Sequence, residues 1–135
     1  MVSKTLELRK VITKLLKEVN KNVFYENATD EAEFPYIVYE IDSISFDYSG
    51  RDDVILTINV WDKDKESKLV ESVSDEIEKK LNYLNYPTGK VLPTFYLINR
   101  ISIPDEDKSI RRRELKFQIQ NYYIGEWYNA RDITW

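Results

Sequence analysis

Three side chains of this sequence have the types and the order that metal-assisted hydrolysis requires. Asp105 follows Pro104, and Glu114 precedes Lys116 by two positions. When a Pro-Asp pair and a Glu-x-Lys triplet lie on adjacent strands, the carboxylates can hold a magnesium ion while the lysine helps to activate water. Glu114 and Lys116 project from the same face of a strand, because side chains alternate along it. The candidate catalytic residues are therefore Asp105, Glu114 and Lys116.

The same three residues also have a simpler interpretation. The pattern resembles the metal-binding core of a large nuclease superfamily, but it is short, and short motifs often match by chance. Alternating charges are also the ordinary content of a strand face that is turned to solvent. We therefore keep a small metal-dependent nuclease as the alternative function and not as the first.

Two further charged patterns favour structural roles. Asp62, Asp64 and Glu66 alternate like the ligands of a calcium loop, but the turn glycine is missing and Val73 stands where the bidentate glutamate belongs. The start of a helix is a better reason for these acids, since carboxylates there are favourable. The basic run at residues 111–113 lies beside acidic residues, and pairing across a hairpin explains it.

The composition excludes several common kinds of site. The chain has 135 residues, which fits one domain, and it contains no cysteine and no histidine. Disulfides, thiolate zinc sites and the commonest general base are therefore excluded. No Gly-rich phosphate loop, bilayer-spanning apolar run or signal-peptide core occurs. No residue set in the chain is suited to ordinary catalysis, which points to an assembly protein more than to an enzyme, with no membrane partner and made in a reducing cytoplasm.

The hydrophobic pattern predicts an α+β fold. Apolar residues recur at steps of three and four in two segments, which predicts helices at about 4–20 and 69–84. Alternating apolar residues predict four strands, at 34–41, 53–61, 95–103 and 115–119, with 23–25 as a candidate short strand. We expect an antiparallel sheet with two helices packed on one face, in the order α-β-β-α-β-β. One core should then contain Leu15, Leu56, Val73, Leu97 and Phe117.

The net charge of −4 is unevenly distributed along the chain. Residues 1–25 carry six basic and two acidic groups, whereas residues 26–53 carry nine acidic groups and one basic group. A solvated acidic loop is the ordinary reason for such a run. The other reason is an acidic surface that repels nucleic acid or docks a basic partner. Recognition of a specific nucleic-acid sequence is not expected.

The order and the residue patterns of three segments resemble those of the tail-terminator or tail-completion proteins of long-tailed bacteriophages. These segments are Phe-Pro-Tyr-Ile-Val-Tyr at 34–39, the strand at 55–61 with its polar step into a helix, and the closing pair of strands at 100–119. The resemblance covers residues 5–121 and contains no catalytic motif. It implies a structural protein of a phage or prophage with a compact α+β domain, with no catalysis, no cofactor and no metal ion.

The resemblance further implies a homohexameric ring that caps the completed tail tube and offers the surface to which the head attaches. The implied partners are further copies of the chain, the tail tube protein and a head-completion or neck protein. The implied place is the head-proximal end of the virion tail, assembled in the cytoplasm of the host bacterium. We expect one domain at 1–123 and an aromatic C-terminal extension at 124–135. The candidate partner-interface residues are Asp47, Asp52, Asp53, Trp127, Tyr128 and Trp135.

Overall fold

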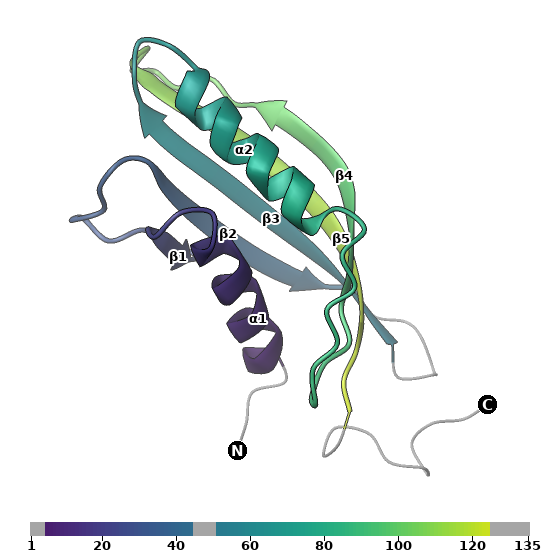
Figure 1. The fold of residues 1–135 in the computed structure, drawn as a ribbon. Coiled ribbons are helices and arrows are strands. Elements are labelled where there is room, and N and C mark those ends of the chain that lie inside the picture. Colours follow the sequence, from purple (N-terminus) through teal and green to yellow (C-terminus); the bar gives the residue numbers. More distant parts are fainter. Residues whose placement is uncertain (1–4, 45–50, 125–135) are drawn as a thin grey trace.

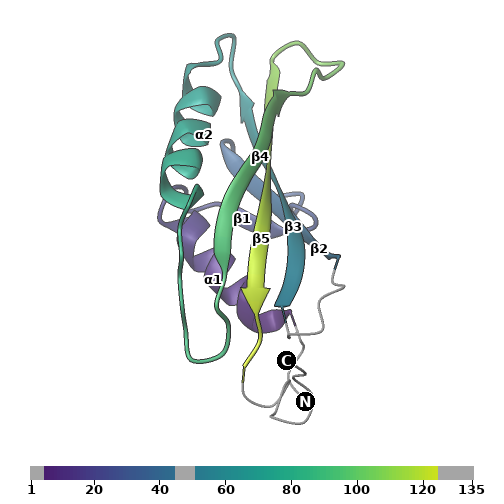
Figure 2. The ribbon, with the colours of Figure 1, turned by 90° about the vertical axis from the view of Figure 1, so that its right-hand side faces the viewer.

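The computed structural model of the chain describes residues 5–44 and 51–124. Its elements are α1 (Leu6–Lys17), β1 (Val23–Tyr25), β2 (Tyr36–Ser43), β3 (Arg51–Lys63), α2 (Lys68–Leu81), β4 (Thr94–Ser102) and β5 (Ile110–Tyr122). The strands form one sheet in the order β1-β2-β3-β5-β4. Both helices lie on the same face of it (Figure 1, Figure 2). The α+β class and the order helix, strands, helix, strands are confirmed.

The sheet is mixed, whereas the sequence predicted an antiparallel one. The short strand β1 runs parallel to β2, and the other three pairings are antiparallel. Both β3 and β4 are antiparallel to β5, so they are parallel to each other, and α2 connects them across the sheet. The antiparallel hairpin of β4 and β5 is confirmed. Neither helix has the length and the apolar content needed to cross a membrane, within the residues described here.

The core lies between the two helices and one face of the sheet. Four of the five residues predicted to share it are buried together, and the fifth, Leu97, is partly buried and packs against them. The inner face of α1 consists of Leu8, Val11, Ile12, Leu15 and Leu16. Among residues 5–44 and 51–124, no helix lies on the opposite face of the sheet, which is called the uncovered face below (Figure 2).

Strand β3 is longer than predicted at its C-terminal end. Asp62 lies inside the strand and is 5% exposed, and the N-cap position of α2 is Ser67. The reason is the length of β5, which supplies a partner for β3 as far as Lys63. The prediction that Asp62 and Asp64 begin the second helix is therefore wrong.

A register shift between Leu97 and Asn99 changes which side chains of β4 enter the core. Phe95 and Leu97 alternate toward the helices, as predicted. After the shift Ile101 points to the uncovered face and is 46% exposed. The alternation of Phe95, Leu97 and Ile101 in the sequence predicted a place in the core for Ile101. That prediction is wrong, because one extra residue in a strand reverses the facing of all that follow.

The shift turns Arg100 toward α2. Its Nη1 lies 2.7 Å from Asp75 Oδ1, and its Nη2 lies 2.6 Å from Glu71 Oε2. Glu71 also accepts a hydrogen bond from Nε of Arg113, and this bond is the main cause that lowers the pKa of Glu71 below its ordinary value. These pairs attach α2 to β4 and β5.

Candidate functional site

The candidate catalytic residues are only partly brought together. Glu114 and Lys116 share the uncovered face, with 4.0 Å between Lys116 Nζ and Glu114 Oε1. Glu114 stands opposite Ile101 in β4, whereas Asp105 lies beyond the end of that strand. There Asp105 accepts a hydrogen bond of 2.9 Å from the backbone N–H of Asp107, as a turn residue does. Within residues 5–44 and 51–124, no three acidic side chains are grouped so that they could hold a metal ion.

The acidic residues at the start of β3 point to opposite sides of the sheet. Asp53 lies on the uncovered face and forms a two-point ion pair with Arg51, at 2.9 and 3.0 Å. Asp52 lies on the helix-covered face and is 1% exposed. The strand begins at Arg51 and not at Asp53, so alternation sends Asp52 inward. Asp52 is therefore buried on the helix-covered face, and the roles of Asp52 and Asp53 at a partner interface stay predictions.

The remaining predicted interface residues lie outside the part of the chain that the structure describes. They are Asp47, Trp127, Tyr128 and Trp135. The division into a domain at 1–123 and an extension at 124–135 also stays a prediction.

An aromatic cluster that the sequence analysis did not identify lies on the uncovered face. The rings of Tyr36 and Trp61 are stacked, with centroids 6.2 Å apart and an interplanar angle of 18°. Phe34 and Phe24 approach Tyr36 at 5.2 and 6.2 Å. Partial burial is the main cause that raises the pKa of the Tyr36 hydroxyl, so it stays protonated at neutral pH. One feature of the sequence could have indicated this cluster. Tyr36 and Trp61 occupy positions of adjacent strands whose side chains point away from the helices.

Arg112 completes this cluster. Its guanidinium carbon lies 4.6 Å from the centroid of the Trp61 ring, within the range of a cation–π contact. Its Nε donates a hydrogen bond of 2.9 Å to Asn59 Oδ1. Arg111 instead donates to the main-chain carbonyl of Lys65, at 2.6 Å. The arginines therefore bond to β3, to the segment after it and to α2, and Arg113 Nη1 also donates across the hairpin to Ser102 Oγ at 2.9 Å. Pairing across the hairpin is thus found at Arg113, but to a hydroxyl, and none of the three arginines forms an ion pair with the described acids at residues 105–107.

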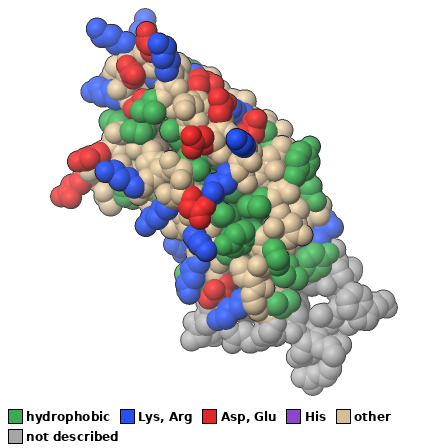
Figure 3. Space-filling view, viewed as in Figure 1, with side chains coloured by type: hydrophobic (Ala, Val, Ile, Leu, Met, Phe, Trp, Pro, Cys, Tyr) green, Lys and Arg blue, Asp and Glu red, His purple; other side chains and the backbone are tan. Residues whose placement is uncertain are grey.

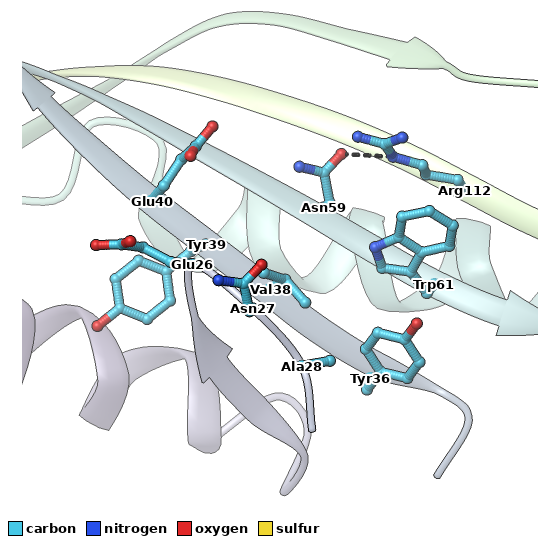
Figure 4. Close-up of a pocket in the computed structure, with 10 residues that line it drawn as sticks. All are labelled: Glu26, Asn27, Ala28, Tyr36, Val38, Tyr39, Glu40, Asn59, Trp61 and Arg112. Atoms are coloured by element: carbon cyan, nitrogen blue, oxygen red, sulfur yellow. Dashed lines mark hydrogen bonds between the residues drawn. The ribbon is translucent and has the colours of Figure 1, made fainter. Parts of the chain in front are cut away.

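A cavity of about 290 Å³ lies beside the aromatic cluster (Figure 4). The residues that line it come from the segment after β1 and from β2, β3 and β5: Glu26, Asn27, Ala28, Tyr36, Val38, Tyr39, Glu40, Asn59, Trp61 and Arg112. Its two carboxylates, from Glu26 and Glu40, lie at one end, and Arg112 lies at the other. The cavity therefore offers negative charge at one end, a guanidinium at the other and aromatic rings between them.

The helix-covered side of the molecule has a different charge pattern. Lysine and arginine side chains gather over α1, whereas acidic side chains follow α2 (Figure 3). The acids of α2 include Glu71 and Asp75, which pair with arginines of the sheet. The cations of α1 have fewer partners, and Lys17 forms no ion pair with any described residue.

Comparisons with known proteins show that this fold recurs. No family model matches the sequence, and no curated protein matches it. Among 33 matching chains of solved structures, one belongs to a structure described as the virion of a native gene transfer agent (GTA) particle. It has a TM-score of 0.63 and 11% identity, and the match covers 79% of this chain and 84% of that one. A second solved protein, whose printed name states no function, has a TM-score of 0.67 and 15% identity, covering 93% of this chain and 100% of that one. At these identities the matches show a shared fold.

Proposed function

We propose that this chain is a structural protein of a phage or phage-like particle. One observation carries the proposal, namely the fold that the chain shares with a chain of the gene transfer agent virion over most of both lengths. The resemblance of the segments at 34–39, 55–61 and 100–119 to tail-completion proteins points to the same class from the sequence. The two lines of support are independent, because one uses backbone geometry and the other uses residue order.

In the finer form of the proposal, the chain caps the completed tail tube as a ring of six copies. A subunit of a ring needs apolar surface that becomes buried when it contacts another molecule. Several apolar residues of this chain are exposed in the single copy and could form such a surface. Ile98 and Ile101 are half-exposed on β4, at one edge of the sheet, and the exposed Tyr83 lies against Tyr96 of the same strand. Phe34 is exposed near the other edge. Apolar residues gathered at the edges of a small domain are typical of interaction surfaces.

The proposed ring has two different partners along its axis. The tail tube protein lies on one side, and a head-completion or neck protein lies on the other, at the head-proximal end of the tail. DNA passes through the centre, so the wall must not hold phosphates tightly. Acidic side chains achieve this by repulsion, which acts over about 8 Å at physiological ionic strength. We propose that Asp47 and Asp53 contribute to this lining, and that the aromatic segment after residue 124 holds subunits together.

The proposal is tested by adding purified protein to tubes of the tail tube protein from the same particle, while the tubes are growing. The expected result is that growth stops, with one ring of this protein at one end of each tube in electron micrographs. Tubes that grow to the same length with and without the protein would contradict the capping role. Binding along the whole tube would assign the chain to a different position in the tail.

The lining is tested by replacing Asp47 and Asp53 with lysine, while Asp52 is retained because it is buried. The matched control replaces Glu76 and Glu106, two exposed acids elsewhere, with lysine. The Asp47/Asp53 variant should assemble into particles but deliver less DNA than the control variant. Equal DNA delivery by both variants would show that Asp47 and Asp53 do not line the passage for DNA.

A further inference from the structure

Helix α1 presents a row of lysines directly away from the core. Lys10, Lys14 and Lys17 follow one another at steps of four and three residues, so they lie on one line along the helix. All three are exposed, and the buried stripe of the helix lies on the opposite side. Lys10 has one ion pair, with Glu7 at 3.2 Å, and Lys14 donates to the hydroxyl of Tyr86 at 3.0 Å. The helix surface is therefore a line of positive charge.

The uncovered face of β2 presents the opposite charge. Glu40 and Asp42 alternate with residues that face the helices, so both carboxylates project to the uncovered side, and both are exposed. Glu26 lies beside Glu40 in the wall of the cavity (Figure 4). The sequence has no lysine or arginine between Lys21 and Arg51. The acidic row has no described basic neighbour on its own strand.

The two charged rows lie on opposite faces of one molecule. Helix α1 covers the inner side of the sheet near β1 and β2, and Glu40 projects from the other side of β2 (Figure 1, Figure 4). They cannot meet within one chain, but they can meet between two copies. An association of this kind uses two different surfaces, and such head-to-tail contacts close into rings when the rotation allows it.

We propose that α1 of one copy lies on the uncovered face of β2 of the next copy, with its lysines opposite Glu40 and Asp42. The proposal rests on the ring assembly proposed above and assigns its subunit interface. Lysines four apart on a helix are separated by about 6 Å along its axis, and carboxylates two apart on a strand by about 6.6 Å. The two rows therefore match in spacing as well as in charge.

The remaining groups on the receiving surface are compatible with this contact. Arg112 lies at the end of the cavity opposite Glu40, where it is held over Trp61 and bonded to Asn59 (Figure 4). Lys116 lies on β5, which is separated from β2 by β3, and its ammonium lies near Glu114. Val38 and the edge of Tyr36 offer apolar surface to the stems of the lysines, which can lie along it while their heads reach the carboxylates.

The interface is tested with two double variants that reverse charge on one row each. The first is Lys10→Glu with Lys14→Glu, the two lysines that are four apart, and the second is Glu40→Lys with Asp42→Lys. Association of the wild-type protein is measured by sedimentation equilibrium at low salt, up to millimolar concentration. Each double variant should associate at least about tenfold more weakly than the wild type, because attraction becomes repulsion. All of these residues are exposed, so the melting temperatures should stay close to that of the wild type.

The deciding measurement is an equal mixture of the two double variants. In a head-to-tail contact between the two different variants, the interface joins either two original rows or two reversed rows, so association should return with the variants alternating. The matched control, Lys65→Glu with Lys108→Glu, reverses two exposed lysines elsewhere and should associate like the wild type. Wild-type association in the separate double variants, no recovery in the mixture, or a wild type that stays monomeric at millimolar concentration would each overturn the proposal.

These outcomes are distinguishable from failure of the proposed function. If the mixture recovers but the assembled protein does not stop the growth of tail tubes, the interface stands and the capping role fails. If the wild type and both double variants cap tubes equally well, the capping role stands and this interface fails.

Discussion

Replacing a buried and an exposed isoleucine by alanine tests the register shift in β4. Ile58 is 0% exposed and stands between Tyr39 and Leu115 in the centre of the sheet. Ile101 stands opposite Glu114 and is 46% exposed on the uncovered face. Without the shift, alternation from Phe95 would place Ile101 in the core as well. The two substitutions are chemically identical, so the difference between them reports burial.

The expected difference follows from the carbon atoms removed. Isoleucine to alanine deletes three carbon groups, and about 0.8 kcal/mol for each gives about 2.4 kcal/mol of lost transfer free energy at Ile58. The cavity left behind increases the loss to about 3–4 kcal/mol. At Ile101 about half of the transfer energy is lost and no enclosed cavity forms, which gives about 1.3 kcal/mol. Lower strand propensity adds up to about 1 kcal/mol at both sites.

Urea unfolding followed by circular dichroism measures this difference. The unfolding free energy of Ile58→Ala should be about 2 kcal/mol lower than that of Ile101→Ala, a shift of about 1 M in the midpoint. If Ile58→Ala does not fold, the valine variants at both sites serve instead, with about 1 kcal/mol expected at Ile58. Equal losses at the two sites would refute the register shift and the assignment of Ile101 to the uncovered face.

Three further predictions concern the core, the attachment of α2 and the candidate catalytic residues. Val73→Asp places a charge in the core and should abolish folding at room temperature, as measured by circular dichroism; an unchanged melting temperature would contradict the placement of α2. The lowered pKa of Glu71 stabilises the fold above the unfolded-state pKa of about 4.3, so Glu71→Gln should lower the melting temperature at pH 7. That difference should disappear as the pH falls through the folded-state pKa, and the exposed control Glu76→Gln should show no such trend. The purified protein should not cleave DNA in the presence of magnesium, and cleavage abolished by Glu114→Ala would restore the nuclease alternative.

The sequence predicted the elements well because their hydrophobic periods are clear. The stripe of α1 from Leu8 to Leu16 and the alternation of β5 at Leu115 and Phe117 each have one plausible period, and both segments fold as predicted. The errors occur where pairing with another strand determines how far an element extends. Asp62 has the character of a helix cap, but the long partner strand β5 keeps it in β3.

The candidate surfaces were harder to predict, because a surface residue leaves little pattern in the sequence. The acidic excess near Glu40 could be counted in the sequence. The sequence did not show that these acids and the lysines of α1 lie on opposite faces of the sheet. The shift at Ile98 has no local signal, since neither glycine nor proline marks it. Asp52 and Asp53 read alike in the sequence, and only the start of β3 determines which of them is buried.

The central proposal is that this chain caps the head-proximal end of a phage or phage-like tail. The most direct test is an electron cryo-microscopy reconstruction of the head–tail junction in the particle that encodes it. The account predicts one ring of six copies between the last layer of the tail tube and the neck. A junction without this chain, or copies of the chain along the tail or in the capsid, would contradict it.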